Sequence, residues 1–272
     1  MFRADQLKRA PGEACQLPEE KKANFRPLYT RLGQAFIVVP RRVVPASENQ
    51  APPAHEHGVV ALDPGVRTFQ TCYDADGNVT QWGVDEMKKI FIACRVADRM
   101  QGRIKGGSSK HARRRRKKAW LRMLLRIRHK IDEVHKKMST WLCRNHRVVL
   151  IPIFETARMS ARRQPDGRSR RLNSKTARAM CTWAHYRFRE RLKAKAELFP
   201  WCRVIECDEA YTSKTCGRCG QLHHKLGGNK TMRCPHPGCG YVADRDISAA
   251  RNILLRFLTK RVGVFSKTPS AT

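Results

Sequence analysis

Residues 209–252 read EAYTSKTCGRCGQLHHKLGGNKTMRCPHPGCGYVADRDISAARN. Two close cysteine pairs, C-x2-C and C-x4-C, lie in this stretch with fourteen residues between them: Cys216, Cys219, Cys234 and Cys239. Four thiolates at such spacing can surround Zn²⁺ as a tetrahedron, and a site closed by four protein ligands is structural. The pattern predicts a zinc ribbon inserted over residues 210–243.

Other readings of these cysteines are weaker. Four unligated core cysteines would need apolar surroundings, and the loop QLHHKLGGNK is polar. Three histidines in the loop could compete as ligands, but four cysteines already satisfy the metal: His223, His224 and His236. The N-terminus lacks the apolar segment of a signal peptide, so we expect an intracellular, reducing compartment, in which eleven cysteines favour metal binding over disulfides.

The charge of the chain points to a polyanionic partner. It has 56 Lys and Arg against 23 Asp and Glu, a formal charge of +33. No apolar run approaches the roughly 18 residues of a membrane span, so we favour nucleic acid over a membrane surface or a ribosomal role. Two clusters are candidate phosphate contacts, and the first would also suit nuclear import: Arg113, Arg114, Arg115, Arg116, Lys117 and Lys118, then Arg162, Arg163, Arg170 and Arg171.

The order of predicted elements indicates an α/β fold. Strands are expected over residues 34–39, 58–63, 66–73, 78–82, 147–154 and 202–207. Helices are expected over 84–100, along an apolar stripe at 120–141, from 173 or 174 to 198, and over 246–258. Three antiparallel strands followed by strands with helical crossovers give a mixed sheet of ribonuclease H-like order. We expect an N-terminal remnant and linker at 1–57, one domain at 58–262 and a tail at 263–272.

Carboxylates stand at both ends of this predicted domain. Asp63 closes the apolar strand GVVALD, where burying an acid is costly without a partner or a metal, although it could also cap the turn at residues 64–65. Asp244 and Asp246 begin the last helix, and only one can be its cap. We assign Asp246 to a Mg²⁺ or Mn²⁺ site, because small residues follow at 249–250, and leave Asp244 as the cap or a supporting acid.

These motifs resemble a known family. ALDPG around Asp63, YTSKTCGRCG, RCPHPGCGY and ADRDISAARNIL are similar to the RuvC-like nuclease and zinc-ribbon portion of the TnpB family, transposon-encoded RNA-guided DNA endonucleases. IPIFETARM and SKTARAMCTWAHYRFRERL are more similar to the Fanzor branch, and the resemblance covers about residues 58–260. It implies a RuvC-like two-metal endonuclease of a transposable element, with DNA and guide RNA as partners. The location would be nuclear in a eukaryote and otherwise cytoplasmic.

The middle catalytic acid departs from the family pattern. The family places a Glu seven residues before a Met, and counting back from Met159 gives Pro152, which has no ligand atom. The Fanzor branch takes its Glu from the later strand, which here is Glu209. Glu209 follows Ile205 and Cys207 on one strand face by the two-residue period. Two competitors remain: Glu155, and the more distant Glu206.

The region before the first acid is short for the family. RNA-guided members carry a sizeable recognition region there, whereas 57 residues precede Gly58. We therefore expect a truncated frame, a degenerate copy or a recognition region on another chain. The alternative function is a catalytically inactive, zinc-ribbon nucleic-acid-binding protein derived from such an element.

Overall fold

The computed structural model describes residues 26–39, 43–54, 58–107, 109–161, 172–207, 211–224, 226–227 and 229–265. The chain divides into two compact units, residues 1–43 and 44–272. The first holds an antiparallel hairpin of β1 (Arg26–Tyr29) and β2 (Ala35–Val38). The second opens with a 3₁₀ turn, Ser47–Asn49, and contains every element discussed below. Within the described residues, no helix combines the length and apolar character needed to cross a bilayer.

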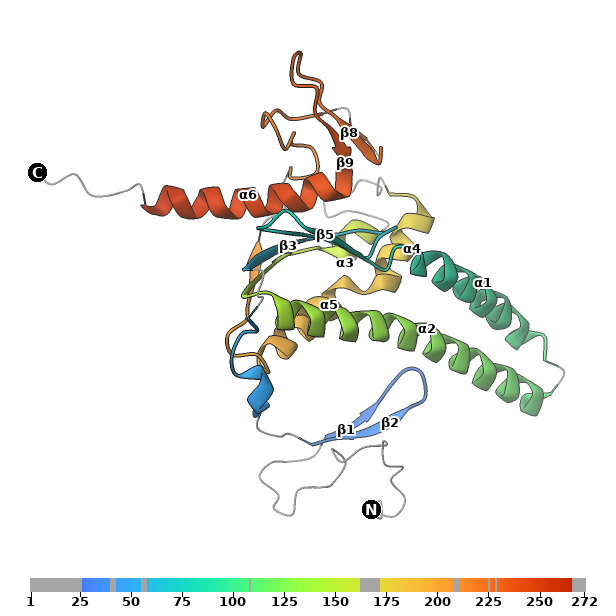
Figure 1. Ribbon diagram of the computed structural model, residues 1–272. Helices are drawn as coiled ribbons and strands as arrows, with labels where there is room; N and C mark the ends of the chain where they lie inside the picture. Colours follow the sequence, from blue (N-terminus) through green and yellow to red (C-terminus); the bar gives the residue numbers. More distant parts are fainter. Residues whose placement is uncertain are drawn as a thin grey trace, which may run out of the picture. The chain divides into compact units, whose positions relative to one another are not determined.

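A five-stranded mixed sheet forms the centre of the second unit (Figure 1). Its order is β5-β4-β3-β6-β7, with β3 antiparallel to β4, β4 antiparallel to β5, and β6 and β7 parallel to β3. The bounds are β3 Val59–Pro64, β4 Gln70–Asp74, β5 Val79–Trp82, β6 Val148–Pro152 and β7 Arg203–Cys207. The predicted ribonuclease H-like fold is confirmed.

Helices cover both faces of this sheet (Figure 1). One face packs on α1 (Glu86–Lys105), α2 (Lys110–Asn145) and α5 (His185–Ala196), and the other on α6 (Arg245–Phe265). The alternation of β3 shows the division, since Val60 and Leu62 join the α2 side whereas Ala61 packs with Ile253 and Leu254 of α6. Both faces of β3 are therefore buried, which explains its continuous apolar sequence.

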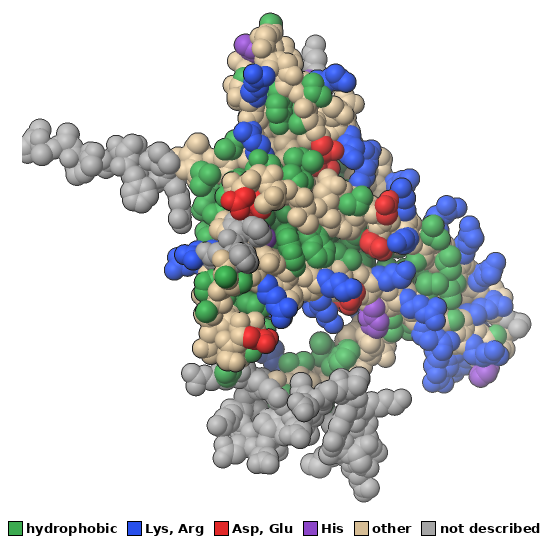
Figure 2. Space-filling view, viewed as in Figure 1, with side chains coloured by type: hydrophobic (Ala, Val, Ile, Leu, Met, Phe, Trp, Pro, Cys, Tyr) green, Lys and Arg blue, Asp and Glu red, His purple; other side chains and the backbone are tan. Residues whose placement is uncertain are grey.

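The helix predicted along the apolar stripe at 120–141 is part of α2, which also carries the basic cluster at 113–118 and pairs with α1 as a helical hairpin. Ser109 caps α2, accepting a hydrogen bond from the Ala112 amide at 3.1 Å. The predicted stripe packs on the core, with Ile127, Ile131 and Met138 buried. Figure 2 shows Lys and Arg side chains gathered over this hairpin. The stripe is thus ordinary core packing, and the opposite side of the helix carries the charge.

The predicted helix from residue 173 to 198 is wrong in one respect: it is two helices. Asn173 begins α4 (Ser174–Trp183) by capping the Thr176 amide at 2.7 Å, but Ala184 has a left-handed backbone (φ 53°) and α5 starts after it. The break lets side chains on both sides of it surround Phe69, whose ring lies 4.7 Å from Trp183, 5.1 Å from His185 and 5.0 Å from Phe188. Periodicity alone does not reveal a single left-handed alanine.

Further bounds differ from expectation at element ends. The strand predicted at 66–73 begins at Gln70, because the Gly65 amide donates to the Phe69 carbonyl and closes a turn. The last helix continues to Phe265 instead of ending at 258. Short strands β8 (Thr231–Arg233) and β9 (Val242–Asp244) form the hairpin that leads into it.

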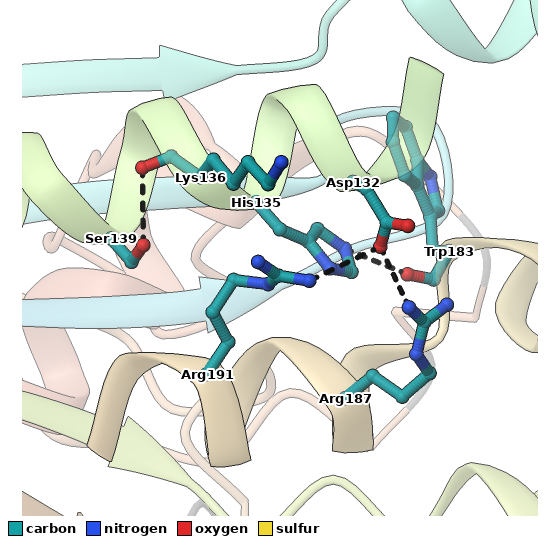
Figure 3. A network of polar contacts seen from close by, with 7 residues as sticks. All are labelled: Asp132, His135, Lys136, Ser139, Trp183, Arg187 and Arg191. Atoms are coloured by element: carbon teal, nitrogen blue, oxygen red, sulfur yellow. Dashed lines mark hydrogen bonds and ion pairs between the residues drawn. The ribbon is translucent and has the colours of Figure 1, made fainter. Parts of the chain in front are cut away.

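A polar network joins α2 to α5 on the side of the sheet opposite α6 (Figure 3). Asp132 accepts from Arg187 at 2.7 Å and from Arg191 at 3.4 Å. His135 is fully buried, its Nε2 lies 3.0 Å from the Trp183 carbonyl, and burial lowers its pKa to about 4. The ring is therefore neutral at pH 7 and carries its proton on Nε2, because a carbonyl can only accept.

Gly83 is a sensitive position of the core. It has φ 71°, and a Cβ there would lie 2.9 Å from both Phe69 Cβ and Trp183 Cη2. We expect Gly83→Ala to lower the free energy of unfolding by about 2 kcal/mol or more, through backbone strain and overpacking, in urea denaturation. Gly102→Ala is the control: it lies within α1 with no atom near its Cβ, and should stabilise by up to about 1 kcal/mol. Equal effects of the two changes would contradict this account.

Candidate active site and metal centre

The four predicted cysteine ligands come together in the ribbon. Their sulfurs all lie within 4.8 Å of one another. Cys216 and Cys239 are 3.8 Å apart at Sγ, and Cys219 and Cys234 are 3.5 Å apart. A tetrahedral ion with Zn–S bonds of about 2.3 Å requires sulfur separations of about 3.8 Å. The cluster therefore fits one tetrahedral metal ion.

Backbone and side-chain packing support this cluster. The Arg218 amide lies 3.5 Å from Cys216 Sγ and the His236 amide 3.5 Å from Cys234 Sγ, as donors to thiolates. Leu226 and Met232 are buried with Cys216 and Cys239 in a small core. Among the residues that the structure describes, these cysteines are the one group of three or more potential ligands gathered closely enough for an ion, so His223, His224 and His236 stand outside it.

Asp63 lies at the carboxyl end of β3, paired with Thr71 of β4 and half-buried. It shares the α6 face of the sheet with Val59 and Ala61 by the two-residue period. Ala61 is level with Leu150 of β6, so two residues further Asp63 is level with Pro152. Open α/β sheets place ligands at this carboxyl edge.

Asp244 and Asp246, at the start of α6, have different roles in the structure. Asp244 accepts from the amides of Asp246 and Ile247 at 2.9 and 3.3 Å, which is the geometry of a helix cap. The Asp246 side chain is 17% exposed and lies 3.4 Å from Arg245. Asp246 lies four residues before Ala250 and seven before Ile253, and therefore on the sheet-facing side of the helix.

The candidates for the middle acid occupy different environments. Glu209 lies outside the described residues. Glu155 precedes the short helix α3 (Thr156–Ser160), is exposed, and pairs with Arg158 at 3.0 Å. Glu206 faces α5, where Lys193 at 2.6 Å and Arg189 at 3.1 Å bind it, and the hydrogen bond from Lys193 lowers its pKa. Glu206 is thus ion-paired on the face opposite Asp63.

Pro152 lies seven residues before Met159, where the resemblance predicts a Glu. It ends β6, level with Asp63, and pairs with Cys207 of β7. Cys207 packs on the α6 side with Ile205. The row Asp63, Pro152, Cys207 therefore runs across the carboxyl edge beneath α6 with a carboxylate at one end.

Of the two predicted basic clusters, the structure describes only the first. Residues 113–118 are exposed on the first turns of α2, and Arg115, Lys118 and Arg122 line a groove of about 470 Å³ with Ala112 and Ala119. Arg162, Arg163, Arg170 and Arg171 lie outside the described residues. Sequence reasoning missed Arg251 and Asn252, which bond the ribbon to α6. Their signal was available, because two polar residues interrupt an apolar helix.

The chain is similar to one protein family and to several known proteins. The family described as "Cas12f1-like, TNB domain" matches residues 185–253. Putative transposase A625R of Paramecium bursaria Chlorella virus 1 is 38% identical over 208 residues, 75% of this chain and 44% of that protein. TnpB-like protein L79 of Acanthamoeba polyphaga mimivirus is 27% identical over 80% of this chain and 40% of its own length. A putative RNA-guided DNA endonuclease of Streptomyces pristinaespiralis is 33% identical over 72% and 44%.

The chain spans less than half the length of these curated relatives. Among solved structures, the cryo-EM structure of the Cas12f1-sgRNA-target DNA complex matches with a TM-score of 0.48 and 15% identity, over 80% of this chain and 52% of that one. The family match over residues 185–253 includes the ribbon and helix motifs of residues 209–252. On these grounds the chain is a member of the TnpB family.

Proposed function

We propose that this protein is a metal-dependent DNA endonuclease of a transposable element. The observation that carries the proposal is the placement of two carboxylates, Asp63 and Asp246, on the same side of the sheet, one at a strand end and one on the helix packed above it. Hydrolysis of a phosphodiester by two Mg²⁺ or Mn²⁺ ions needs such oxygen ligands. When bound, the ions activate the attacking water and stabilise the leaving oxygen.

The third acid in this proposal is Glu209. Pro152 leaves the edge without a carboxylate between Asp63 and Cys207, and Glu209 comes two residues after Cys207 in the sequence, just beyond the end of β7. Asp63, Glu209 and Asp246 would then hold the ions, and Asp244 would fix the start of α6. The name of the Streptomyces pristinaespiralis relative supports guidance by RNA.

The ribbon metal in this proposal is Zn²⁺. Four sulfur donors at tetrahedral separations suit Zn²⁺, and they leave no open position for a substrate or water. The ion would therefore stabilise the ribbon and take no part in cleavage.

Cleavage of labelled single-stranded DNA with Mn²⁺ or Mg²⁺ tests the activity, and two variants test the middle acid. Glu209→Gln is expected to lower the rate by about two orders of magnitude or more, because one ion ligand is lost. Glu155→Gln serves as the control, since that acid is exposed and paired with Arg158. Retained activity in Glu209→Gln together with loss in Glu155→Gln would transfer the role to Glu155.

The groove on α2 would contact phosphates. Replacing Arg115, Lys118 and Arg122 by Gln is expected to reduce the slope of log K against log salt for duplex DNA by about 2.7, or 0.9 for each lost contact. The control removes the same charge at Lys88, Lys89 and Lys137, each paired with a nearby acid at 3.1–3.2 Å. Equal slopes for both triple variants would mean that only the overall charge matters.

A second candidate function is nucleic-acid binding without cleavage. Pro152 favours it, because the resemblance predicts a Glu at this position and proline has no side-chain atom that can bind a metal ion. Metal-independent binding with no cleavage at any Mg²⁺ or Mn²⁺ concentration would support this function and overturn the endonuclease.

A further inference from the structure

Asn252 joins the zinc ribbon to α6. Its Nδ2 donates to the carbonyl of Thr212 at 2.9 Å and to that of Thr215 at 2.8 Å, and the residue is 7% exposed. Both hydrogens of the Asn252 side-chain amide therefore bond to the same turn, residues 211–215. A buried amide that serves two carbonyls cannot be removed without leaving buried acceptors unpaired.

A second contact lies beside the first. Arg251 donates to the carbonyl of Gly217, between Cys216 and Cys219 of the first cysteine pair. A Cβ on Gly217 would lie 2.7 Å from the Arg251 guanidinium and 3.2 Å from the Tyr241 hydroxyl. The first half of the cysteine cluster is thus held against the helix by neighbouring residues of one turn.

The turn held by Asn252 is tightly wound. Tyr211 has φ 65°, which is rare for a residue with a side chain, and it is 64% exposed. Its carbonyl accepts from the Lys214 amide at 2.9 Å, the Thr215 amide at 3.0 Å and the Thr215 hydroxyl at 2.9 Å. Such a conformation persists where its surroundings fix it, and the bonds from Asn252 are part of those surroundings.

These contacts join the segment that follows β7 to the helix that carries Asp246. Cys207 ends β7 on the α6 side, and the chain is fixed to α6 again at Thr212. Asp246 lies six residues before Asn252, about 9 Å along the same helix axis. Asn252 therefore ties the chain leaving the carboxyl edge of β7 to the helix that carries Asp246.

We propose that Asn252 is a positioning residue for the divalent-ion site. Through its two hydrogen bonds it fixes the 211–215 turn on α6, and so sets the separation between the carboxyl edge of the sheet and Asp246. The inference rests on the proposed function, because it assumes that Asp63 and Asp246 bind ions. Asn252 itself touches neither an ion nor DNA.

The test is a titration of Mn²⁺ into the zinc-loaded full chain without nucleic acid, with free Mn²⁺ measured by its EPR signal. Asn252→Ala removes both donors, and Asn252→Asp places an acceptor against two carbonyls. We expect both to weaken Mn²⁺ binding at least about five-fold, with Asp the more severe, while one zinc per chain is retained. The matched control is Arg218→Ala, which removes a 2.9 Å bond to the Cys239 carbonyl within the ribbon and should bind Mn²⁺ as the wild type does.

The outcomes separate this inference from the proposed function. A wild-type chain that binds no Mn²⁺ would overturn both. Wild-type affinity in the zinc-loaded Asn252 variants would overturn the positioning role and leave the proposed function standing. Loss of zinc or of cooperative unfolding in both variants would make Asn252 a folding residue and likewise overturn the positioning role.

Discussion

Replacing Asp63 by Asn is expected to reduce Mn²⁺-dependent DNA cleavage by about a thousand-fold. The substitution preserves shape but replaces an ionised carboxylate with a neutral amide at the end of β3. A neutral amide cannot offset the charge of closely spaced divalent ions. Loss of one electrostatic group at a reacting centre costs about 10²–10³ in rate, and the loss of a charged ion ligand should stand at the upper end.

Asp98→Asn is the matched control for this experiment. Asp98 is an exposed acid of α1 that binds Arg178 through both carboxylate oxygens, at 2.6 and 2.8 Å. Asp98→Asn removes one negative charge from the same unit, as Asp63→Asn does, but leaves the carboxyl edge of the sheet unchanged. Urea denaturation should show both variants folded. Full cleavage by Asp63→Asn would remove Asp63 from the site, whereas equal losses in both variants would indicate a general effect of charge.

Replacing Cys216 by Ser is expected to remove the zinc ion and unfold the ribbon. The small core around Cys216, Leu226 and Met232 is too small to support folding alone. Structural zinc contributes about 10–16 kcal/mol of binding free energy in ribbon-sized peptides, so its loss exceeds what this core can offset. Metal analysis should fall from one zinc per chain to near zero, and the amides of β8 and β9 should lose protection from hydrogen exchange.

Cys181→Ser provides the control, because Cys181 is exposed on α4 and lies outside the cluster. It should keep one zinc and wild-type exchange rates. Protected β8 and β9 amides in metal-free Cys216→Ser would show that the ribbon folds without the ion.

The sheet was predictable because its pattern is local. Composition and period are enough to recognise three of its segments: the apolar run before Asp63, the turn residues after Asp74 and the strand at Arg203–Cys207. Their order then permits few topologies. The candidate metal-binding cysteines were likewise predictable, because their pattern is defined by the number of residues between them along the chain.

Features that depend on tertiary contacts were not predictable. The left-handed Ala184 exists because Trp183 and His185 both pack on Phe69, and neither contact is visible in a helical period. The bonds of Asn252 to Thr212 and Thr215 span about forty residues of sequence. The two acids at the start of α6 are a different case, because the sequence already favoured Asp244 as the cap and the amide distances agree with that assignment.

The placement of α6 over β3 also governs how the protein is made. Asp63 and Asp246 are 183 residues apart in the chain, so a ribosome adding 5–20 residues per second takes roughly ten to forty seconds between them. During that time β3 lacks the helix that covers Ala61. The nascent chain can form its antiparallel strands early, but Asp246 reaches the Ala61 side of the sheet only after the start of α6 has been synthesised.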